Sequence, residues 1–420
     1  MRVLQINTFY LFGSTGRIVW DLKTLAEQKG IESFAAFGPE IDNGDNGIMR
    51  MQSIPRRKVN ILRTRLFDHH GFYNKTETNR LINWMDELKP DIIHLHNLHN
   101  HYIHIGMLFE YIKKHDIPVV WTLHDCWPFT GHCAHFDYIH CEKWKTECYD
   151  CSLLKKYPPT WFFDRSTRNY RDKKDVFCGV SHMTLVTPSQ WLADLIHYSF
   201  LSDYKVSIIN NGVDTIAFRP HANDIKKKLG INGKKMLLAI ATSFNRMKGT
   251  DYLHRLPLEL SDDEVLVLVG LEEKQKKQFS HSKCRALGRT NCLKELAAYY
   301  SAADVFINPT LEDNFPTTNI EALACGTPVV TFKTGGSIES VLDGESISND
   351  NGIIYSSVGA VVPKGDLKAM LGAARHIMAK GKTTYREACR KKAEGRYEKN
   401  KQYQKYIDLY NELYAKSVNS

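Results

Sequence analysis

The stretch from residue 304 to residue 330, DVFINPTLEDNFPTTNIEALACGTPVV, constrains the fold of this chain more than any other. The short apolar run at residues 305–308 predicts a buried strand, and a helix is expected after the loop that follows. Gly326 and Pro328 end that helix, and the apolar run at residues 329–332 predicts a second strand. The stretch therefore predicts a strand, a loop, a short helix and another strand in immediate succession.

The beginning of this helix, near Thr317, is expected to bind an anion. First-turn amide groups have no partner within a helix, and the helix dipole is positive at that end. Glu321 stands in the first turn, where its carboxylate would repel a diphosphate unless it faced a neutral group rich in donors, such as a ribose diol. Thr318 and Glu321 also fit a capping box, which needs no ligand.

The same stretch carries a family resemblance. An acidic residue, an Asn-Phe-Pro turn and a glutamate eight positions after the acid, followed by EALACGTPVV, resemble the E-x7-E signature of the family 4 retaining glycosyltransferases. That family has the two-domain GT-B fold. The resemblance implies that Glu321 binds the ribose, that the turn amides hold the diphosphate, and that Asp313 touches the donor sugar. Asp313 replaces the usual glutamate and Glu312 lies beside it, so either carboxylate could reach the sugar.

The alternation of strands and helices divides the chain into two domains. A chain of 420 residues is too long for one ordinary core, and the alternation restarts after residues 210–220, NNGVDTIAFRP, whose Asn, Gly and Pro indicate a linker. The pattern predicts two doubly wound α/β sheets of Rossmann type that face an interdomain cleft, as in GT-B. We expect an N-terminal acceptor-side domain at 1–210, a C-terminal nucleotide-sugar-binding domain at 211–396, and a last helix at 397–420 that packs back on the first domain.

Two cations follow a predicted strand of the second domain. Arg246 and Lys248 would stabilise a departing nucleoside diphosphate more than the bound donor, although both could instead be solvated surface residues. The resembled family carries GRLxxxKG here, so Lys248 matches its lysine, Ser243 stands in place of its arginine, and Arg246 could substitute from nearby. The donor-binding residues that the resemblance implies are Ser243, Glu312, Asn314, Phe315, Pro316, Thr317, Thr318 and Glu321.

A glycine-bearing turn follows the first strand of the chain. Gly13, Ser14, Thr15 and Gly16 precede the first predicted helix, where a flexible backbone can approach a ligand closely. The resemblance places this loop over the acceptor and the donor phosphates.

Two buried strands of the first domain end in polar residues. His96, Asn97 and His99 follow one of them, and His124 and Asp125 follow the next. Ligands of open parallel sheets bind beyond the carboxyl ends of the strands. The resemblance implies that His124 lies near the reacting carbon or the hydroxyls of the donor sugar, and Asp125 could fix its tautomer by accepting the second N–H. The implied catalytic residues are thus His124, Asp313, Arg246 and Lys248.

Five of the ten cysteines lie in a predicted insertion at residues 126–151. Four of them, Cys133, Cys141, Cys148 and Cys151, could hold a structural zinc ion that gives the insertion its fold and leaves no open position for catalysis. Free buried cysteines are an alternative, and disulfides are disfavoured in a cytosolic chain. A branch of the resembled family that acts in bacterial surface-polysaccharide synthesis is similar through TLHDCWPFTGHCAHFDYIHCEKWK.

The net charge of +9 at pH 7 favours an anionic partner. One basic segment mixes Arg56, Arg57, Lys58, Arg63 and Arg65 with Val59, Ile61, Leu62, Leu66 and Phe67, which predicts either docking on an anionic membrane or an ordinary solvated helix face. The start, MRVLQINTF, lacks the features of a signal peptide, and there is no apolar run of about 18 residues that could span a bilayer. We therefore expect a cytoplasmic protein, at the inner membrane face if the basic segment docks.

These observations predict a retaining glycosyltransferase that moves a sugar from a nucleotide diphosphate donor to a saccharide or lipid-linked saccharide acceptor in surface polysaccharide or capsule synthesis. No catalytic cofactor is expected, because Lys248, Arg246 and the helix dipole would supply the positive charge. A sugar-nucleotide epimerase or a phosphorylase of the same fold is an alternative, since fold does not determine function. A zinc-containing nucleic-acid binder is disfavoured, because the aromatic residues are not interleaved with a basic stripe, so no nucleic acid partner is expected.

Overall fold

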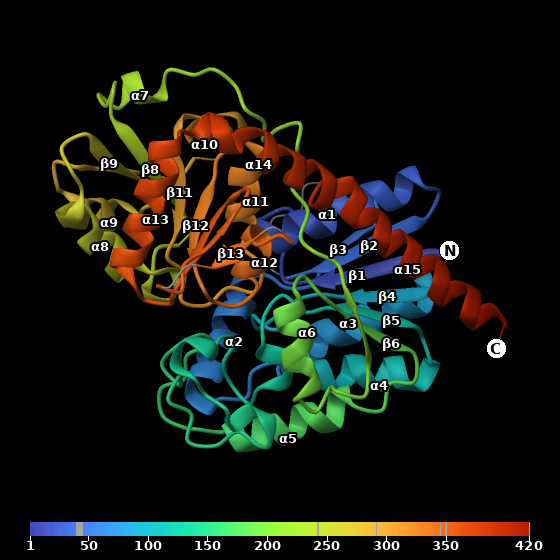
Figure 1. Ribbon diagram of the computed structural model, residues 1–420. Coiled ribbons are helices and arrows are strands. Elements are labelled where there is room, and N and C mark those ends of the chain that lie inside the picture. Colours follow the sequence, from blue (N-terminus) through green and yellow to red (C-terminus); the bar gives the residue numbers. More distant parts are fainter. Residues whose placement is uncertain (39–44, 242, 291, 345, 349–350, 420) are drawn as a thin grey trace. The chain divides into compact units, whose positions relative to one another are not determined.

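The computed structural model describes residues 1–38, 45–241, 243–290, 292–344, 346–348 and 351–419 (Figure 1). The chain forms two compact units. Unit 1 comprises residues 1–209 and 403–420, and unit 2 comprises residues 210–402. Among the helices of the described ranges, none combines the length and the apolar character that spanning a bilayer requires.

Unit 1 is built on a seven-stranded sheet in the order β3-β2-β1-β4-β5-β6-β7, and all neighbouring strands in it are parallel. Its strands are β1 (Arg2–Asn7), β2 (Glu32–Phe37), β3 (Ile48–Arg50), β4 (Ile92–Leu95), β5 (Val119–Thr122), β6 (Met183–Thr187) and β7 (Lys205–Ile208). Its helices are α1 (Gly13–Gln28), α2 (Ile54–Phe67), α3 (Lys75–Leu88), α4 (Ile105–His115), α5 (Ser166–Phe177) and α6 (Gln190–His197). Three 3₁₀ turns, η1 (Trp127–Phe129), η2 (Asp137–Ile139) and η3 (Lys143–Lys145), lie between β5 and α5.

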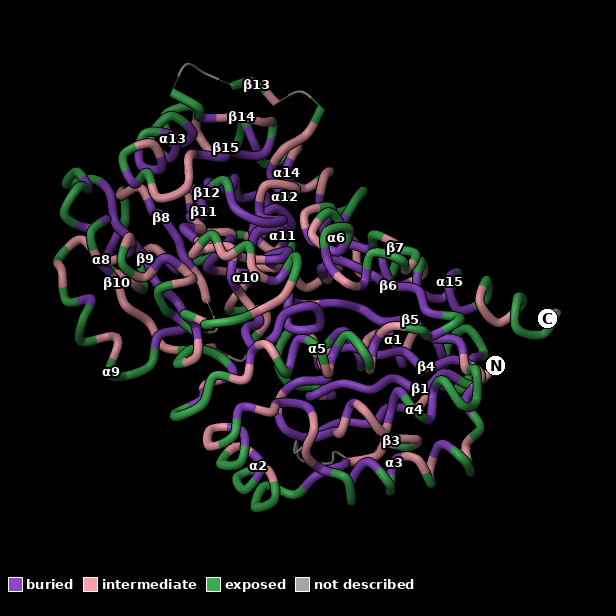
Figure 2. Tube along the Cα trace, turned by 90° about the horizontal axis from the view of Figure 1, so that it is seen from below, coloured by how far each residue is buried: buried purple, intermediate pink, exposed green. Residues whose placement is uncertain are grey.

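The middle strands of this sheet are buried along their whole length, as Figure 2 shows in purple for β4 and β5. Strands of a parallel sheet read as continuous apolar runs because helices cover both faces. The sequence runs IIHL and VVWT follow this rule, except for His94, which is fully buried. A buried polar side chain needs hydrogen-bond partners, and one of the two partners of His94 comes from the other end of the chain.

The last helix, α15 (Lys399–Asn419), supplies this partner from its residues in unit 1. The Tyr410 hydroxyl lies 2.6 Å from His94 Nδ1, and His94 Nε2 lies 2.8 Å from Thr122 Oγ1. Thr122 in turn donates to the Tyr406 hydroxyl at 3.2 Å. This buried chain of hydrogen bonds joins the C-terminal residues of the protein to β4 and β5.

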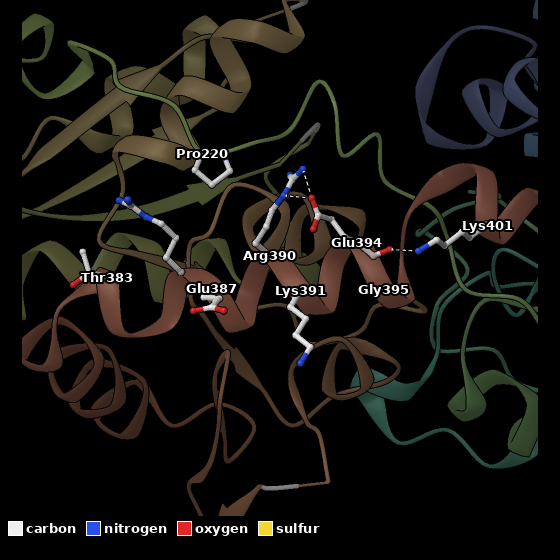
Figure 3. Close-up of a pocket in the computed structure, with 9 residues that line it drawn as sticks. Pro220, Thr383, Glu387, Arg390, Lys391, Glu394, Gly395 and Lys401 are labelled. Carbon is white, nitrogen blue, oxygen red and sulfur yellow. Dashed lines mark hydrogen bonds and ion pairs between the residues drawn. The ribbon is translucent and has the colours of Figure 1, made fainter.

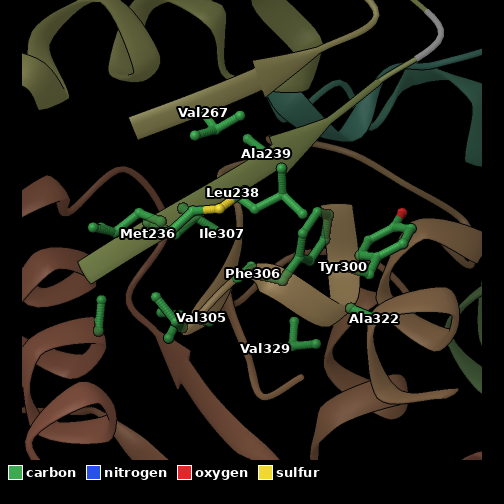
Figure 4. Close-up of a cluster of buried hydrophobic side chains, with 14 of the residues drawn as sticks. Met236, Leu238, Ala239, Val267, Tyr300, Val305, Phe306, Ile307, Ala322 and Val329 are labelled. Atoms are coloured by element: carbon green, nitrogen blue, oxygen red, sulfur yellow. The ribbon is translucent and has the colours of Figure 1, made fainter. Parts of the chain in front are cut away.

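Unit 2 contains an eight-stranded sheet in the order β10-β9-β8-β11-β12-β15-β14-β13, which is parallel from β10 to β15 and antiparallel at β14 and β13. Its strands are β8 (Lys235–Ile240), β9 (Glu264–Val269), β10 (Cys284–Leu287), β11 (Val305–Asn308), β12 (Val329–Phe332), β13 (Ile347–Ser348), β14 (Ile354–Ser356) and β15 (Gly359–Val362). Its helices include α7 (Ile225–Lys228), α8 (Thr250–Glu259), α9 (Glu273–Lys276), α10 (Leu293–Ala302), α11 (Thr317–Ala324), α12 (Ser337–Val341), α13 (Leu367–Lys380) and α14 (Lys382–Arg396). Figure 4 shows part of its core, in which the Tyr300 ring lies beside Phe306 of β11.

Each sheet has a point where the strand order reverses. In unit 1 the chain builds outward in both directions from the β1 and β4 pair, and in unit 2 from the β8 and β11 pair. Ligands of doubly wound sheets bind beyond the carboxyl ends of the strands at such a switch point, because the loops there diverge. The predicted doubly wound sheet is therefore confirmed in both units, and each presents one switch point to a ligand.

Candidate active site

Two loops of unit 2 lock together beyond β8 and β11. The Leu311 amide donates to the Met247 carbonyl at 2.7 Å. Gly249 has φ +74°, and a Cβ at this position would lie only 2.0 Å from the Pro309 carbonyl oxygen. Glycine is required here for both the backbone conformation and the close approach. The two loops therefore present their side chains as one surface.

Lys248 and Asp313 form an ion pair across these loops, between Nζ and Oδ2. Both side chains are partly exposed, at 31% for Lys248 and 17% for Asp313. Glu312 is 1% exposed by contrast, and its carbonyl accepts a hydrogen bond from Thr310 Oγ1 at 3.0 Å. Of the two adjacent carboxylates, Asp313 is thus the one that stands beside the predicted cation.

The helix that follows, α11, begins at Thr317, as the sequence predicts, but Glu321 lies beyond its first turn and not within it as expected. Pro316 is its N-cap residue and no side chain caps its first turn, so the capping box between Thr318 and Glu321 is not formed. Thr317 and Thr318 are half-buried. The preceding turn is held inside unit 2, because Asn314 and Phe315 are buried and the Phe315 carbonyl accepts from Asn211 Nδ2 at 3.1 Å.

Glu321 is oriented by a tyrosine that the sequence analysis did not identify. The Tyr300 hydroxyl donates to Glu321 Oε2 at 2.8 Å, and the Tyr300 side chain is fully buried. Burial, together with the nearby carboxylate, raises the pKa of Tyr300 well above its ordinary value, so the phenol keeps its proton and remains a donor. The run ELAAYYSA, which contains Tyr300, offers no signal beyond the apolar periodicity of an ordinary helix.

The remaining predicted donor residues of unit 2 are solvent-facing. Ser243 and Arg246 are both exposed, and Arg246 begins a 3₁₀ turn, η4 (Arg246–Lys248). The Asn245 side chain caps this turn by accepting from the Lys248 amide at 3.1 Å. Lys248, the last residue of this turn, forms the ion pair with Asp313, and the exposed Arg246 is its first residue.

In unit 1 the four residues Gly13, Ser14, Thr15 and Gly16 form the first turn of α1, so the expectation that they precede the helix is wrong. Gly13 and Ser14 are exposed, whereas Gly16 is buried and a Cβ there would lie 3.0 Å from the Tyr10 carbonyl oxygen. A ligand at this place would therefore contact the backbone amides of a helix first turn and not a flexible loop.

His124 is paired with His96, not with Asp125. Gln5 donates from Nε2 to the Val19 carbonyl at 3.2 Å, so its amide oxygen accepts from His96 Nε2 at 3.3 Å. His96 Nδ1 must then accept from His124 Nε2 at 3.1 Å. Burial lowers the pKa of His124 to about 4, so the imidazole is neutral at pH 7, with its proton on Nε2 and an acceptor at Nδ1.

Asp125 faces a different histidine. Its Oδ2 lies 2.8 Å from His99 Nε2, and its Oδ1 accepts from the Trp127 amide at 2.9 Å. Burial alone would raise the pKa of Asp125, but His99 outweighs this effect and the pKa falls to about 2. The expectation that Asp125 fixes the tautomer of His124 is therefore wrong. The two residues are adjacent in the sequence, but Asp125 contacts His99 and His124 contacts His96.

The four cysteines of the insertion, Cys133, Cys141, Cys148 and Cys151, line one small cavity together with His132. All are free thiols, and within the part of the chain that the structure describes no group of three or more His, Cys, Asp or Glu is arranged to hold a metal ion. The geometry thus gives the expected zinc ion no support. The Cys133 thiol hydrogen-bonds to Cys151, which raises the pKa of Cys133 and lowers that of Cys151 to about 7.

A cavity of about 670 Å³ lies along α14 in unit 2 (Figure 3). One of its cations, Arg390, is already engaged in contacts within the protein. Arg390 pairs with Glu394 and donates to the carbonyls of Thr215, Phe218 and Ala324. None of the predicted site residues lines this cavity, which we regard as structural.

Two family models match successive parts of the chain. The model of glycosyltransferase family 4 matches residues 38–216, and the model of glycosyl transferases group 1 matches residues 222–396. The chain belongs to the family 4 glycosyltransferases. In its GT-B fold the glycosyltransferase is similar to sucrose-phosphate synthase from Thermosynechococcus elongatus, at a TM-score of 0.70 and 17% identity over 99% of this chain and 100% of that one.

A relative and a second structure resemble this glycosyltransferase over most of its length. The putative colanic acid biosynthesis glycosyl transferase WcaC of Escherichia coli K12 is 28% identical over 79% of this chain and 82% of its own. HepE of Anabaena, solved in complex with UDP and glucose, has a TM-score of 0.65 and 15% identity over 98% of this chain and 100% of its own. The second likeness concerns the fold alone.

Proposed function

We propose that this glycosyltransferase moves a hexosyl group, with retention of configuration, from a nucleoside diphosphate sugar to a saccharide or lipid-linked saccharide in surface polysaccharide synthesis. The reaction would take place in the cytoplasm, at the inner membrane face when the acceptor is lipid-linked. One observation carries the proposal. At the switch point of unit 2, Lys248 and Asp313 stand in loops that are locked together next to the start of α11, and Glu321 is held in that helix by Tyr300.

The diphosphate is the ligand that best fits the start of α11. No side chain caps this helix, so its first-turn amides remain available to phosphate oxygens. The Lys248 ammonium has three donors, so it can serve a phosphate oxygen without leaving Asp313. A diphosphate that departs from the sugar gains negative charge, and a fixed cation stabilises that state more than the bound donor.

The ribose is the proposed partner of Glu321. A carboxylate accepts hydrogen bonds from a pair of hydroxyls, and Tyr300 restricts the carboxylate to one orientation before the ligand arrives. Such preorganisation reduces the entropy that binding costs. The same carboxylate turned toward the phosphates would repel them, so its orientation matters for donor affinity.

Retention is proposed to proceed by attack on the same face of the sugar, with the leaving diphosphate accepting the proton of the acceptor hydroxyl. Asp313 is assigned to the donor sugar, because it is more accessible than Glu312. His124 is assigned to the sugar as a neutral hydrogen-bonding group, which its lowered pKa supports. No cofactor has a role in this scheme.

Binding of nucleotide sugars tests the proposal most directly. A ligand that binds the folded state raises the unfolding temperature, so we would screen UDP-, GDP- and ADP-sugars for thermal stabilisation. UDP-glucose comes first, because HepE was solved with UDP and glucose. We expect Glu321→Ala and Lys248→Met to remove the stabilisation by the donor that is found, while both variants remain folded.

The matched control is Glu387→Ala, which removes an exposed carboxylate from α14 in the same unit. It should respond to donors as the parent protein does. Normal donor binding by Glu321→Ala would contradict the assignment of the ribose. Product analysis with and without an acceptor then separates a transferase from an epimerase, which needs no acceptor.

A further inference from the structure

Helix α2 (Ile54–Phe67) turns a polar side toward the rest of unit 1, whereas an ordinary amphipathic helix buries its apolar side. Its two buried residues are polar, Asn60 and Thr64. Asn60 contacts Asn74, and Thr64 Oγ1 lies 3.0 Å from His101 Nδ1. The side that faces the protein is therefore held by hydrogen bonds, and the apolar residues of the helix must lie elsewhere.

Those apolar residues face outward. Val59 and Leu62 are 51% and 47% exposed, and Leu66 completes a stripe at the spacing i, i+3, i+7, which runs along one side of a helix. Figure 2 draws most of α2 in the green of exposed residues. The helix has no acidic residue, and the exposed cations Lys58 and Arg63 flank the stripe.

A second exposed apolar group lies in the segment 155–165, which we call the aromatic loop. It carries three consecutive aromatic residues, Trp161, Phe162 and Phe163, of which Phe162 is 71% exposed. Two exposed lysines, Lys155 and Lys156, precede them in the same segment. Single exposed hydrophobic side chains are normal, but a contiguous group indicates a binding surface.

The aromatic loop and α2 are joined directly, as the close position of α2 and the loops between β5 and α5 in Figure 1 illustrates. The Trp161 amide donates to the Arg65 carbonyl at 2.8 Å, and Thr160 Oγ1 donates to the same oxygen at 3.2 Å. The Arg65 guanidinium lies 5.4 Å from the centre of the Trp161 ring, within cation–π range. The stripe of α2 and the three aromatic residues thus form a single surface, which we call the docking face.

Two carboxylates, the buried Asp68 and the exposed Asp164, hold this surface in place. Asp68, which ends α2, accepts from the Arg165 amide at 2.9 Å and lies 2.8 Å from His132 Nδ1. Asp164 accepts from the Cys151 amide at 2.6 Å. The cysteine-bearing insertion therefore supports the aromatic loop through His132 and Cys151, which gives that insertion a structural task.

We propose that the docking face binds an anionic lipid bilayer, with the three aromatic residues of the loop entering the interface and the lysines and arginines meeting lipid phosphates. Aromatic residues beside cations are the combination that interfacial segments use, because the rings take up the boundary region and the cations gain from the negative surface potential. The inference rests on the proposed function, because docking on a bilayer would give the enzyme access to a lipid-linked acceptor. Its test does not depend on donor binding.

Charge complementarity favours a bilayer over a second copy of this chain. Lys58, Arg63, Lys155 and Lys156 outnumber the one carboxylate of the aromatic loop, Asp164, so the exposed rim of the docking face is positive on balance and two copies placed face to face would repel each other. The apolar stripe of α2 and the aromatic loop together offer an extended exposed surface, which suits a flat partner.

Sedimentation with vesicles tests the proposal. The full chain should bind vesicles that contain phosphatidylglycerol and should not bind vesicles of phosphatidylcholine alone, and binding should weaken when salt reduces the Debye length from about 10 Å at 0.1 M to about 3 Å at 1 M. The triple variant W161S/F162S/F163S should bind anionic vesicles at least about tenfold more weakly, because burial of one aromatic side chain is worth roughly a factor of ten or more. Lys58→Glu combined with Arg63→Glu should also weaken binding.

The control is Ile216→Ser, which removes a side chain of unit 2 that is 80% exposed and lies outside the docking face. It should bind vesicles normally. All variants should keep the thermal stabilisation by the donor in the absence of lipid, so a failure of donor binding would count against the proposed function and leave the docking face untouched. Equal vesicle binding by the triple variant and the parent would overturn the docking face. The proposal would also be overturned if the parent protein bound no vesicles but self-associated, and the triple variant did not self-associate.

Discussion

Replacement of Tyr300 by phenylalanine tests whether donor binding depends on the orientation of the Glu321 carboxylate, because the variant keeps Glu321 and removes only the hydroxyl that orients it. Tyr300 contributes a single side-chain hydrogen bond, from its hydroxyl to Glu321 Oε2 at 2.8 Å. Its backbone carbonyl accepts from Thr327 Oγ1 at 2.6 Å and from Lys382 Nζ at 3.1 Å, and neither bond depends on the side chain. Tyr300→Phe keeps the ring in its core site beside Phe306, so it removes one donor and creates no large cavity.

The magnitude follows from the type of bond. A hydrogen bond to a charged group contributes about 1.5–3 kcal/mol net, and the lower end applies because Glu321 is only half-buried and water can replace the hydroxyl. About 1.4 kcal/mol corresponds to a factor of ten in binding. We therefore expect the affinity for the nucleotide donor to fall by about tenfold, with a small loss of stability.

Isothermal titration with the donor identified in the thermal screen measures this change. The matched control is Tyr299→Phe, since Tyr299 is the neighbouring residue of α10 and its hydroxyl donates to Glu295 Oε1 at 3.3 Å, away from α11. The control should bind the donor as the parent does. The reasoning is refuted if Tyr300→Phe binds the donor with unchanged affinity while Glu321→Ala does not bind it.

Two further predictions concern stability. Burial lowers the pKa values of His94, His96 and His124, the last to about 4, so the folded state favours the neutral imidazoles. This contribution to the free energy of unfolding is complete above pH 6.5. It is lost as the pH falls toward 4, by about 1.4 kcal/mol per pH unit for each histidine. All seven tryptophans lie in unit 1, so tryptophan fluorescence during urea unfolding at several pH values should report this loss, and a flat profile between pH 6.5 and 4.5 would contradict it. Gly249→Ala should destabilise unit 2 by more than about 1 kcal/mol, because its Cβ would meet the Pro309 carbonyl at a positive φ. Circular dichroism in urea measures this, and an unchanged midpoint would show that the loops after β8 and β11 are not locked together.

The strands and helices near the site were predictable because their signals are local. The apolar runs at β4, β5, β8 and β11 and the helix start at Thr317 follow from periodicity and from breaking residues. The alternation of these elements also predicts a doubly wound parallel sheet on each side of residue 210, whereas the order of the strands comes from the structure. The predicted start of α1 was too late, because the sequence of its first turn, which begins at Gly13, resembles that of a loop.

Side-chain partners were predicted less well, because they depend on packing between distant segments. Asp125 follows His124 in the sequence, yet it turns to His99, while His124 donates to His96 on the neighbouring strand. Four cysteines at suggestive spacings converge on one cavity without an arrangement that holds a metal ion among the described residues.

The sequence by itself determined the class of the fold, the order of its elements, and the positions of Lys248, Asp313 and Glu321 beyond strand ends, since hydrophobic period and turn chemistry are properties of short segments. Only the tertiary structure decided which groups meet. Tyr300 reaches Glu321, Lys248 pairs with Asp313, and Trp161 joins Arg65 across a separation of 96 residues in the chain. Such contacts arise where elements pack against one another, and no local pattern of residues encodes them.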